Sequence, residues 1–204
     1  MHEIVCRETA NTERCSGKNL MDSDLIPRLR ELESKAKQYV ENWDSFKRDE
    51  IGLLLFGDVS TGKTYADGCI ANALIDKEVS VLMVGVSDMV NRMQGNFGAD
   101  RDSYMTSLMR PKLLILDDLG AERNTSFGKE RVFDVINRRR LTGKPMIITT
   151  NIPIATMKKA ASLDERRIYD RILEVCVPIR FDGENFRRGN AKHNLEKAAQ
   201  LLRD

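Results

Sequence analysis

The sequence lacks a long apolar run and a strong net charge, and each absence excludes a class of protein. No stretch approaches the roughly 18 consecutive apolar residues of a membrane-spanning helix. The N-terminus also lacks the basic and then apolar segments of a signal peptide. A net charge of +2, from 33 basic and 31 acidic residues, is no general nucleic-acid signature, so any DNA-binding charge must be local. We therefore expect a cytoplasmic protein without a membrane partner.

The four cysteines are few and scattered, which argues against a disulfide framework. Cys69 and Cys176 lie in apolar segments, as expected of reduced thiols in a reducing compartment. Cys6 and Cys15 lie in a polar N-terminal stretch, with His2 as the only nearby histidine. Zinc sites usually draw four ligands from tighter spacings such as C-x-x-C, so a loose arm is favoured and a zinc site is the alternative.

The length of 204 residues suits one main domain with appendages, and 41% apolar with 31% charged residues is typical of a soluble globular protein. Apolar residues recur at three- and four-residue spacing from Ser23 to about Phe46, which predicts an amphipathic helix after a polar arm. We expect three parts: the arm and this helix over residues 1–47, a core over 48–188 and a C-terminal helix over 189–204.

One motif organises the chain: residues 57–64 match the phosphate-loop pattern G-x-x-x-x-G-K-[ST] directly after an apolar run. Gly57 and Gly62 let the backbone curl around phosphates, and the N–H groups that begin the next helix hold anionic oxygens. Lys63 adds positive charge near the β- and γ-phosphates, and Thr64 supplies a hydroxyl to Mg²⁺. The expected nucleotide-binding residues are Gly57, Asp58, Val59, Ser60, Thr61, Gly62, Lys63, Thr64 and Tyr65.

An apolar stretch over residues 113–120 ends in two carboxylates, Asp117 and Asp118, which is a Walker B pattern. The carboxyl ends of the strands form the ligand crevice of a doubly wound sheet, so both acids should reach the nucleotide. Asp117 is expected to bind Mg²⁺, usually through water. Asp118 stands where many such ATPases have a glutamate that orients the attacking water. Without the phosphate loop, a strand followed by an Asp-Asp turn would be the simpler explanation.

A further buried strand over residues 146–151 brings Asn151 to the same edge, where its amide would contact the γ-phosphate or the attacking water. The alternative role of Asn151 is a turn or helix cap before Pro153. The basic triplet over 138–140 ends the preceding helix and is either a solvated cap or a contact to DNA or a neighbouring subunit. The other expected elements are strands over 51–56, 79–86 and 175–181, helices over 63–77, 127–141 and 163–173, a helix from 87, and a loop with a short helix over 95–110.

The phosphate loop, the acidic strand and the Thr-Asn strand, in this order and spacing, resemble an additional-strand AAA+ ATPase. The narrower resemblance is to the bacterial helicase-loader family of the DnaC and DnaI type, with which the IstB transposition ATPases share motifs. It is carried by residues 115–122, 148–151, 167–171, Phe181, Phe186 and Arg187. The resemblance implies an α/β P-loop fold of three αβα layers, with a five-stranded parallel sheet of order 5-1-4-3-2 and a reduced C-terminal lid. It also implies hydrolysis of ATP with Mg²⁺ and an ATP-dependent homo-oligomer.

The resemblance assigns roles to two arginines. In such loaders an arginine of an R-x-x-x-R segment reaches the ATP site of the adjacent subunit; Arg171 matches it, with Arg167 as the second choice. Such a residue is worth about 10³ to 10⁵ in rate. A later arginine, which senses the γ-phosphate within its own subunit, is matched by Arg187. From residue types alone, surface ion pairs with nearby acids would explain both arginines.

Two features depart from the family pattern. Asp58 stands where the family often has proline or a basic residue, and a carboxylate near phosphates weakens nucleotide binding unless it points to solvent. The N-terminal arm lacks the tight cysteine pairs of loaders that bind the helicase through a zinc module. The partner surface of the arm is therefore not identified by the resemblance.

The resemblance favours a loader that binds single-stranded DNA with ATP and delivers a hexameric replicative helicase in the initiation of DNA replication. Single-stranded DNA is usually bound in a basic groove, and the candidate residues for such a groove are Arg92, Arg101, Arg110 and Lys112. Two alternatives keep the fold. One is a transposition helper ATPase that binds duplex target DNA. The other is an ATP-gated adaptor with negligible turnover, which an aspartate in place of glutamate at Asp118 would permit.

Overall fold

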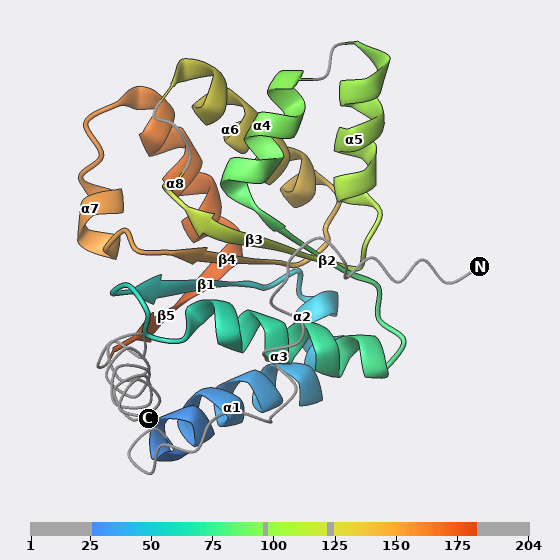
Figure 1. The fold of residues 1–204 in the computed structure, drawn as a ribbon, viewed down its shortest axis with the longest axis vertical. Helices are drawn as coiled ribbons and strands as arrows, with labels where there is room; N and C mark the ends of the chain where they lie inside the picture. The colour runs from blue at the N-terminus through green and yellow to red at the C-terminus, as the bar shows by residue number, and fades with distance from the viewer. Residues whose placement is uncertain (1–25, 96–97, 122–124, 183–204) are drawn as a thin grey trace, which may run out of the picture.

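The computed structural model describes residues 26–95, 98–121 and 125–182, and its centre is a five-stranded sheet in which neighbouring strands are parallel (Figure 1). The strand order β2-β3-β4-β1-β5 is the predicted order 5-1-4-3-2 counted from the other edge, so this prediction is confirmed. All carboxyl ends meet at one edge, at the left in Figure 1. The strands are β1 (Gly52–Gly57), β2 (Val81–Gly85), β3 (Leu113–Leu119), β4 (Met146–Thr150) and β5 (Cys176–Phe181).

Helices cover both faces of the sheet and complete the three predicted layers (Figure 1). One face carries α1 (Ile26–Glu41), α2 (Trp43–Arg48) and α3 (Lys63–Asp76). The other face carries α4 (Val86–Gly95), α5 (Ala99–Met109), α6 (Ser126–Leu141) and α8 (Leu163–Val175), and the short α7 (Ile154–Lys158) follows β4.

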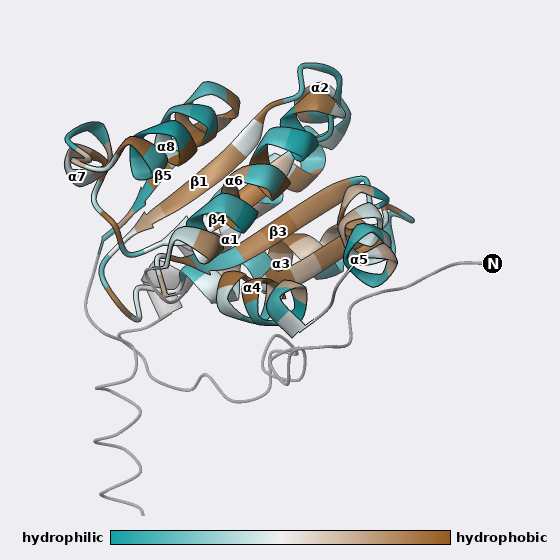
Figure 2. Cartoon of the chain, turned by 90° about the horizontal axis from the view of Figure 1, so that it is seen from above, coloured by the Kyte–Doolittle hydropathy of each residue, from teal (hydrophilic) through white to brown (hydrophobic). Residues whose placement is uncertain are grey.

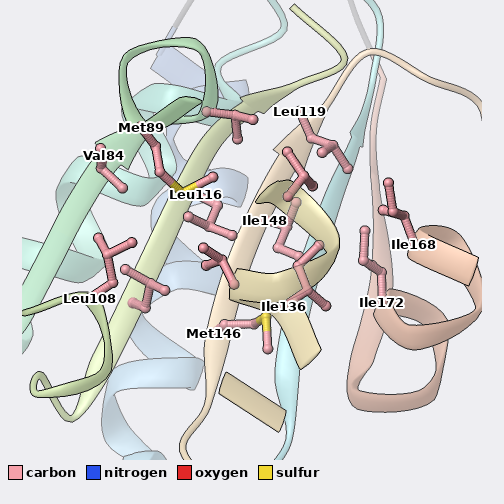
Figure 3. Packing of buried hydrophobic residues seen from close by; sticks show 14 of the residues in the cluster. Val84, Met89, Leu108, Leu116, Leu119, Ile136, Met146, Ile148, Ile168 and Ile172 are labelled. Carbon is pink, nitrogen blue, oxygen red and sulfur yellow. The ribbon is translucent and has the colours of Figure 1, made fainter. Parts of the chain in front are cut away.

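The strands are apolar on both faces because helices cover both. Successive strand side chains point in opposite directions, so Leu55 packs in the cluster beneath α1 and α3 while Leu54 packs in the cluster beneath α4, α6 and α8. Figure 3 shows the second cluster, where Leu116 and Ile148 of neighbouring strands lie beside Ile136 of α6. Strands are mostly brown and outer helix surfaces mostly teal in Figure 2, which fits this burial.

The N-terminal amphipathic helix is two helices, so the single helix expected to about Phe46 is wrong. The chain leaves the helical path at Asn42, whose backbone has φ −97° and ψ 17°, and the Asn42 side chain donates to the carbonyl oxygen of Gln38 at 2.8 Å. A side-chain bond back to the preceding turn competes with helix continuation. After the break, Trp43 packs edge-on against Tyr39, with ring centroids 6.0 Å apart.

Two further elements differ from the prediction. The segment expected as a loop with a short helix is the eleven-residue helix α5, which buries only Met105 and Leu108 and so shows a weak apolar pattern. The helix α7 was not predicted, because a five-residue helix has too few positions to display a period. The helix begins after Pro153 at the N-cap, and its Met157 side chain is buried in the core.

The basic triplet at the end of α6 is not a uniformly solvated or ligand-binding surface. Arg138 is exposed, but Arg139 is fully buried, and burial lowers its pKa to about 10. The Arg139 guanidinium joins the loops at the amino ends of β3 and β4. It donates to the carbonyl oxygens of Met109, Pro111, Lys112 and Pro145. Arg139 therefore has a structural role, which corrects the expectation for this residue.

Several expectations fall outside the described residues. They are the arm with Cys6 and Cys15, the reduced lid, Arg187 and the C-terminal helix. Within the described part of the chain, no helix is both long and apolar enough to cross a membrane.

Candidate nucleotide-binding site

The phosphate loop joins β1 to α3 at the carboxyl edge of the sheet, and its glycines have the backbone conformations that the motif requires. Gly62 precedes α3 with φ +94°. Gly57 has φ +147°, and a Cβ there would lie 2.1 Å from the carbonyl oxygen of Phe181 on β5. A side chain at either position would strain the loop or push β5 away.

Ser60 has φ +64° at the middle of the loop, in the left-handed region that costs a non-glycine residue energy. Its Oγ atom is buried and has no hydrogen-bond partner among the described protein groups. The sequence pattern allows any residue at this position, so the strain could not be read from the motif.

Lys63 is folded onto its own loop, with only 7% of the residue exposed. Its Nζ donates to the carbonyl oxygens of Gly57 at 2.9 Å and Asp58 at 2.7 Å. Burial lowers the pKa of Lys63, and the charges of Asp118 and Asp117 oppose that shift. The ammonium therefore lies against the first two residues of the loop, where it can exchange carbonyl oxygens for phosphate oxygens.

Asp58 is exposed, so its carboxylate lies in water rather than in the loop. Only the Asp58 carbonyl oxygen takes part in the loop, accepting from Lys63 and from Thr61 Oγ1 at 2.9 Å. Water and salt screen an exposed charge within about 10 Å, which limits its repulsion of phosphate. A carboxylate near the phosphates was expected to weaken nucleotide binding unless it points to solvent, and the Asp58 side chain is exposed to solvent.

Thr64 and Asp117 come from separate elements and meet at the mouth of the loop. Thr64 Oγ1, in the first turn of α3, donates to Asp117 Oδ1 at 3.1 Å and lies 3.3 Å from Oδ2. Mg²⁺ prefers hard oxygen ligands and typically takes one or two carboxylates besides water and phosphate. A hydroxyl and a half-buried carboxylate side by side are groups of the kind that this ion takes, and Mg²⁺ binding by Thr64 and Asp117 stays a prediction.

Asp118 and Asn151 also lie together at this edge. The Asn151 Nδ2 group donates to Asp118 Oδ1 at 3.2 Å, and both side chains are exposed. Asp118 has φ +62°, which turns the strand end so that consecutive acids do not simply alternate between faces. The pair is open to solvent, so a water molecule can reach both side chains.

Two residues of this site were missed at the sequence level. Thr149 of β4 is 1% exposed, and its Oγ1 donates to Asp117 Oδ1 at 2.5 Å and accepts from the Asp118 N–H at 2.8 Å. Asp67 of α3 is fully buried without a hydrogen-bond partner for either carboxylate oxygen. Burial raises the pKa of Asp67 well above its ordinary value, and the charge of Asp117 raises it further. Asp67 follows Lys63 by four residues on the buried helix face, a signal that the sequence did contain.

The predicted arginine finger, Arg171, lies on α8 and pairs with Glu174 at 2.8 Å. Surface ion pairs with acids were the alternative for this residue, although Glu174 was not among the acids considered. The second choice, Arg167, lies at a pocket of about 270 Å³ between α6 and α8. The pocket is lined by Ser126, Lys129, Glu130, Phe133, Asp164 and Arg167.

The four candidates for a DNA groove do not share one environment. Arg92 lies over the Tyr104 ring at 4.5 Å, and Arg101 Nε donates to the Met93 carbonyl oxygen at 3.1 Å, so both contribute to the packing of α4 and α5. Arg110 and Lys112 are exposed just before β3. They therefore lie at the amino edge of the sheet, opposite the phosphate loop.

The strand order, the phosphate loop after β1, the acids that end β3 and the polar end of β4 together define a P-loop ATP-binding protein of the AAA+ class. The chain belongs to the family of IstB-like ATP binding proteins, whose model matches residues 29–194.

The relatives of this chain include named helicase loaders. It is 30% identical to the "Replicative helicase loader DnaI" of Bacillus subtilis strain 168 over 67% of this chain and 47% of that protein. It is 29% identical to the "Replicative helicase loader DnaC" of Escherichia coli K12 over 68% of this chain and 56% of that protein. The chain thus spans about half the length of these relatives.

The solved structure titled "Crystal Structure of the DnaI" has the same fold. It superimposes with a TM-score of 0.64 at 24% identity, over 88% of this chain and 94% of that chain. At that identity the likeness shows the fold alone.

Proposed function

We propose that the protein is an ATP-hydrolysing helicase loader, which assembles on single-stranded DNA and delivers a replicative helicase ring to that strand when replication begins. The two relatives named as replicative helicase loaders, at 30% and 29% identity, support the cellular role. The contact between Thr64 Oγ1 and Asp117 carries the ATP-dependent part, because it joins the phosphate loop to the acidic strand.

In the proposed reaction each residue of the site has a separate task. Loop N–H groups bind the phosphates of ATP, and Lys63 leaves the loop carbonyl oxygens for phosphate oxygens. Bound Mg²⁺ would neutralise charge on the β- and γ-phosphates, held by Thr64 and Asp117. Asp118 and Asn151 orient the attacking water, since the Asn151 amide already holds the Asp118 carboxylate at 3.2 Å.

The site is proposed to be completed by a neighbouring subunit. Arg171 then leaves Glu174 and reaches the γ-phosphate bound to the adjacent copy, where it stabilises the charge of the transferred group. Arg187 is proposed to sense the γ-phosphate within its own subunit. ATP would thus serve both as fuel and as the link between copies.

The division into parts is a proposal as well: an arm and helix over residues 1–47, an ATPase core over 48–188 and a C-terminal helix over 189–204. The first part is proposed to meet the helicase in the cytoplasm. Its described portion already packs on the core, since Tyr39, Val40 and Trp43 share an apolar cluster with α3.

The experiment measures anisotropy of a labelled single-stranded oligonucleotide with ATP, with ADP and without nucleotide, at two salt concentrations. We expect ATP-dependent, salt-sensitive binding, followed by recovery of a hexameric helicase when ATP-loaded protein is used as bait in lysate. Lys63→Ala should lose both. Lys158→Ala, which removes an exposed lysine on α7 outside the part proposed to meet the helicase, is the matched control. Equal binding of the oligonucleotide with ATP, with ADP and without nucleotide would contradict the proposal.

A second candidate is a transposition helper that marks duplex DNA, which the family description "IstB-like ATP binding protein" favours. This function would use the same nucleotide site but a different DNA substrate. Competition between long duplex and single-stranded DNA for the ATP-loaded protein separates the two. A clear duplex preference would favour the transposition helper.

A further inference from the structure

The two acids of β3 face a single residue of β4. Leu116 pairs with Ile148 and Leu119 pairs with Thr150, so Asp117 and Asp118 together stand opposite one residue, Thr149. This is a β-bulge, which locally breaks the ladder and re-aims side chains. The left-handed backbone of Asp118, with φ +62°, accommodates the extra residue.

The Thr149 hydroxyl occupies the gap that the bulge leaves. A hydroxyl has one hydrogen to donate, and here the donation goes to Asp117 Oδ1 at 2.5 Å. The Thr149 Oγ1 atom also accepts from the Asp118 N–H at 2.8 Å, a group that the bulge has removed from regular pairing. With 1% of Thr149 exposed, water does not take over either bond.

We propose that Thr149 is a positioning residue that sets the direction of both acids, aiming the Asp117 carboxylate at Thr64 and holding the backbone turn from which Asp118 meets Asn151. The inference rests on the proposed function, because it concerns acids assigned there to Mg²⁺ and to the attacking water. Its consequence is that one hydroxyl couples the metal-binding acid to the water-orienting acid.

The competing explanation is that the Thr149 hydroxyl only stabilises the fold. The neighbouring Thr150 provides a hydroxyl for comparison that has no hydrogen bond with the side chains of the two acids. Thr150 is on the same strand, is fully buried, and has two similar hydrogen bonds: it donates to the Leu119 carbonyl oxygen at 2.7 Å and accepts from the Ile152 N–H at 3.1 Å. Both partners are backbone groups rather than acids. Loss of the Thr150 hydroxyl therefore reports the cost of a missing buried bond alone.

The test compares Thr149→Val, Thr149→Ser and Thr150→Val in the full chain. Valine keeps the shape without the hydroxyl, and serine keeps the hydroxyl. The first readout is the melting temperature without ligands. The second is the affinity for a fluorescent, non-hydrolysable ATP analogue, measured at increasing Mg²⁺ concentration to find the concentration at which half of the gain in affinity is reached. Changes to groups that orient a metal ligand typically cost 10- to 100-fold in metal affinity.

We expect Thr149→Val to raise this Mg²⁺ concentration by about 10-fold while Mg²⁺-free binding of the analogue stays near wild type. Thr149→Ser should restore the Mg²⁺ response, and Thr150→Val should lower only the melting temperature. If Thr149→Val does not fold, Thr149→Ala removes the hydroxyl without adding a methyl group beneath Asp117.

The inference is overturned if Thr149→Val and Thr150→Val both lower the melting temperature and neither changes the Mg²⁺ response. If wild type binds the analogue with no Mg²⁺ response, the proposed metal site fails, and the inference fails with it. If wild type does not bind the analogue, the proposed function itself fails.

Discussion

Arg171 on α8 donates a hydrogen bond to Glu174 of the same helix at 2.8 Å. The second carboxylate oxygen of Glu174 accepts from Arg140 of α6 at 2.6 Å, and these two hydrogen bonds lower the pKa of Glu174. Because the Arg171 and Glu174 side chains are 42% and 40% exposed, water screens the pair and it is easily exchanged. A pair this weak can be broken at little cost, which the proposed action of Arg171 on a neighbouring subunit requires.

The first prediction is that Arg171 acts in trans. Arg171→Ala should bind ATP normally but lose assembly-dependent hydrolysis by about 10³-fold or more. Lys63→Ala should also be inactive, because its own loop is defective. A mixture of the two variants should regain phosphate release, since Lys63→Ala subunits supply Arg171 to intact loops.

The control for this experiment is Arg140→Ala, which removes the other arginine bound to the same Glu174 carboxylate. It should keep hydrolysis near wild type. If the mixture stays inactive, Arg171 does not act across subunits. If Arg140→Ala is as inactive as Arg171→Ala, the network around Glu174 matters for folding rather than for catalysis.

The second prediction separates an ATPase from an ATP-gated adaptor. Asparagine, like aspartate, tolerates the left-handed backbone of position 118, so the Asp118→Asn variant should keep the bulge and the fold. Loss of the carboxylate should reduce steady-state phosphate release about 100-fold or more while ATP binding is retained. Phosphate release with and without DNA is the measurement. Unchanged release in the variant would instead favour an adaptor whose residual turnover does not use Asp118.

Much of the fold could be predicted because its signals are local. Continuous apolar runs identified the buried parallel strands, and the phosphate-loop pattern located the turn between β1 and α3. The strand order came from the resemblance to the AAA+ class, and the structure confirms it. That order brings Asp117 to the same edge of the sheet as the phosphate loop, but β4 lies between β3 and β1, so the contact of Asp117 with Thr64 also depends on the position of α3.

The missed features depend on tertiary contacts that no local pattern contains. Arg139 resembles its neighbours in the basic triplet, and only the four backbone carbonyl groups brought to it by separate loops make it structural. Thr149 begins the polar end of β4, but its role depends on a bulge in the neighbouring strand, which no local pattern shows. Asp67 is the exception, since a carboxylate four residues after Lys63 was visible on the buried helix face.

The third prediction concerns strain in the phosphate loop. Ser60→Gly should stabilise the fold by about 0.5 to 1 kcal/mol, because the left-handed conformation costs serine more than glycine loses in chain entropy. The melting temperature should rise by about 2 °C. Ser45→Gly, at an exposed position inside α2, should lower it instead. A fall of similar size in both variants would show that the Ser60 side chain itself supports the loop.

The last prediction follows from Asp67, whose carboxyl is buried without a hydrogen-bond partner. Burial raises its pKa well above the ordinary value of 3.8, so the folded chain keeps a proton that the unfolded chain has already lost. The free energy of unfolding must therefore fall as pH rises from about 4 to the folded pKa, by at most about 1.4 kcal/mol per pH unit. Asp67→Asn removes this loss because its side chain carries no charge at any pH. In melting curves between pH 4 and 9, the melting temperature of Asp67→Asn relative to that of wild type should rise as pH increases.

Asp76→Asn is the matched control, since Asp76 lies at the exposed end of the same helix. Its melting curve should run parallel to that of wild type across the pH range. The asparagine at position 67 still buries an unpaired amide, so the absolute stability of Asp67→Asn is not the diagnostic quantity; its pH slope is. Parallel curves for Asp67→Asn and wild type would mean that the Asp67 carboxyl is solvated or paired in solution.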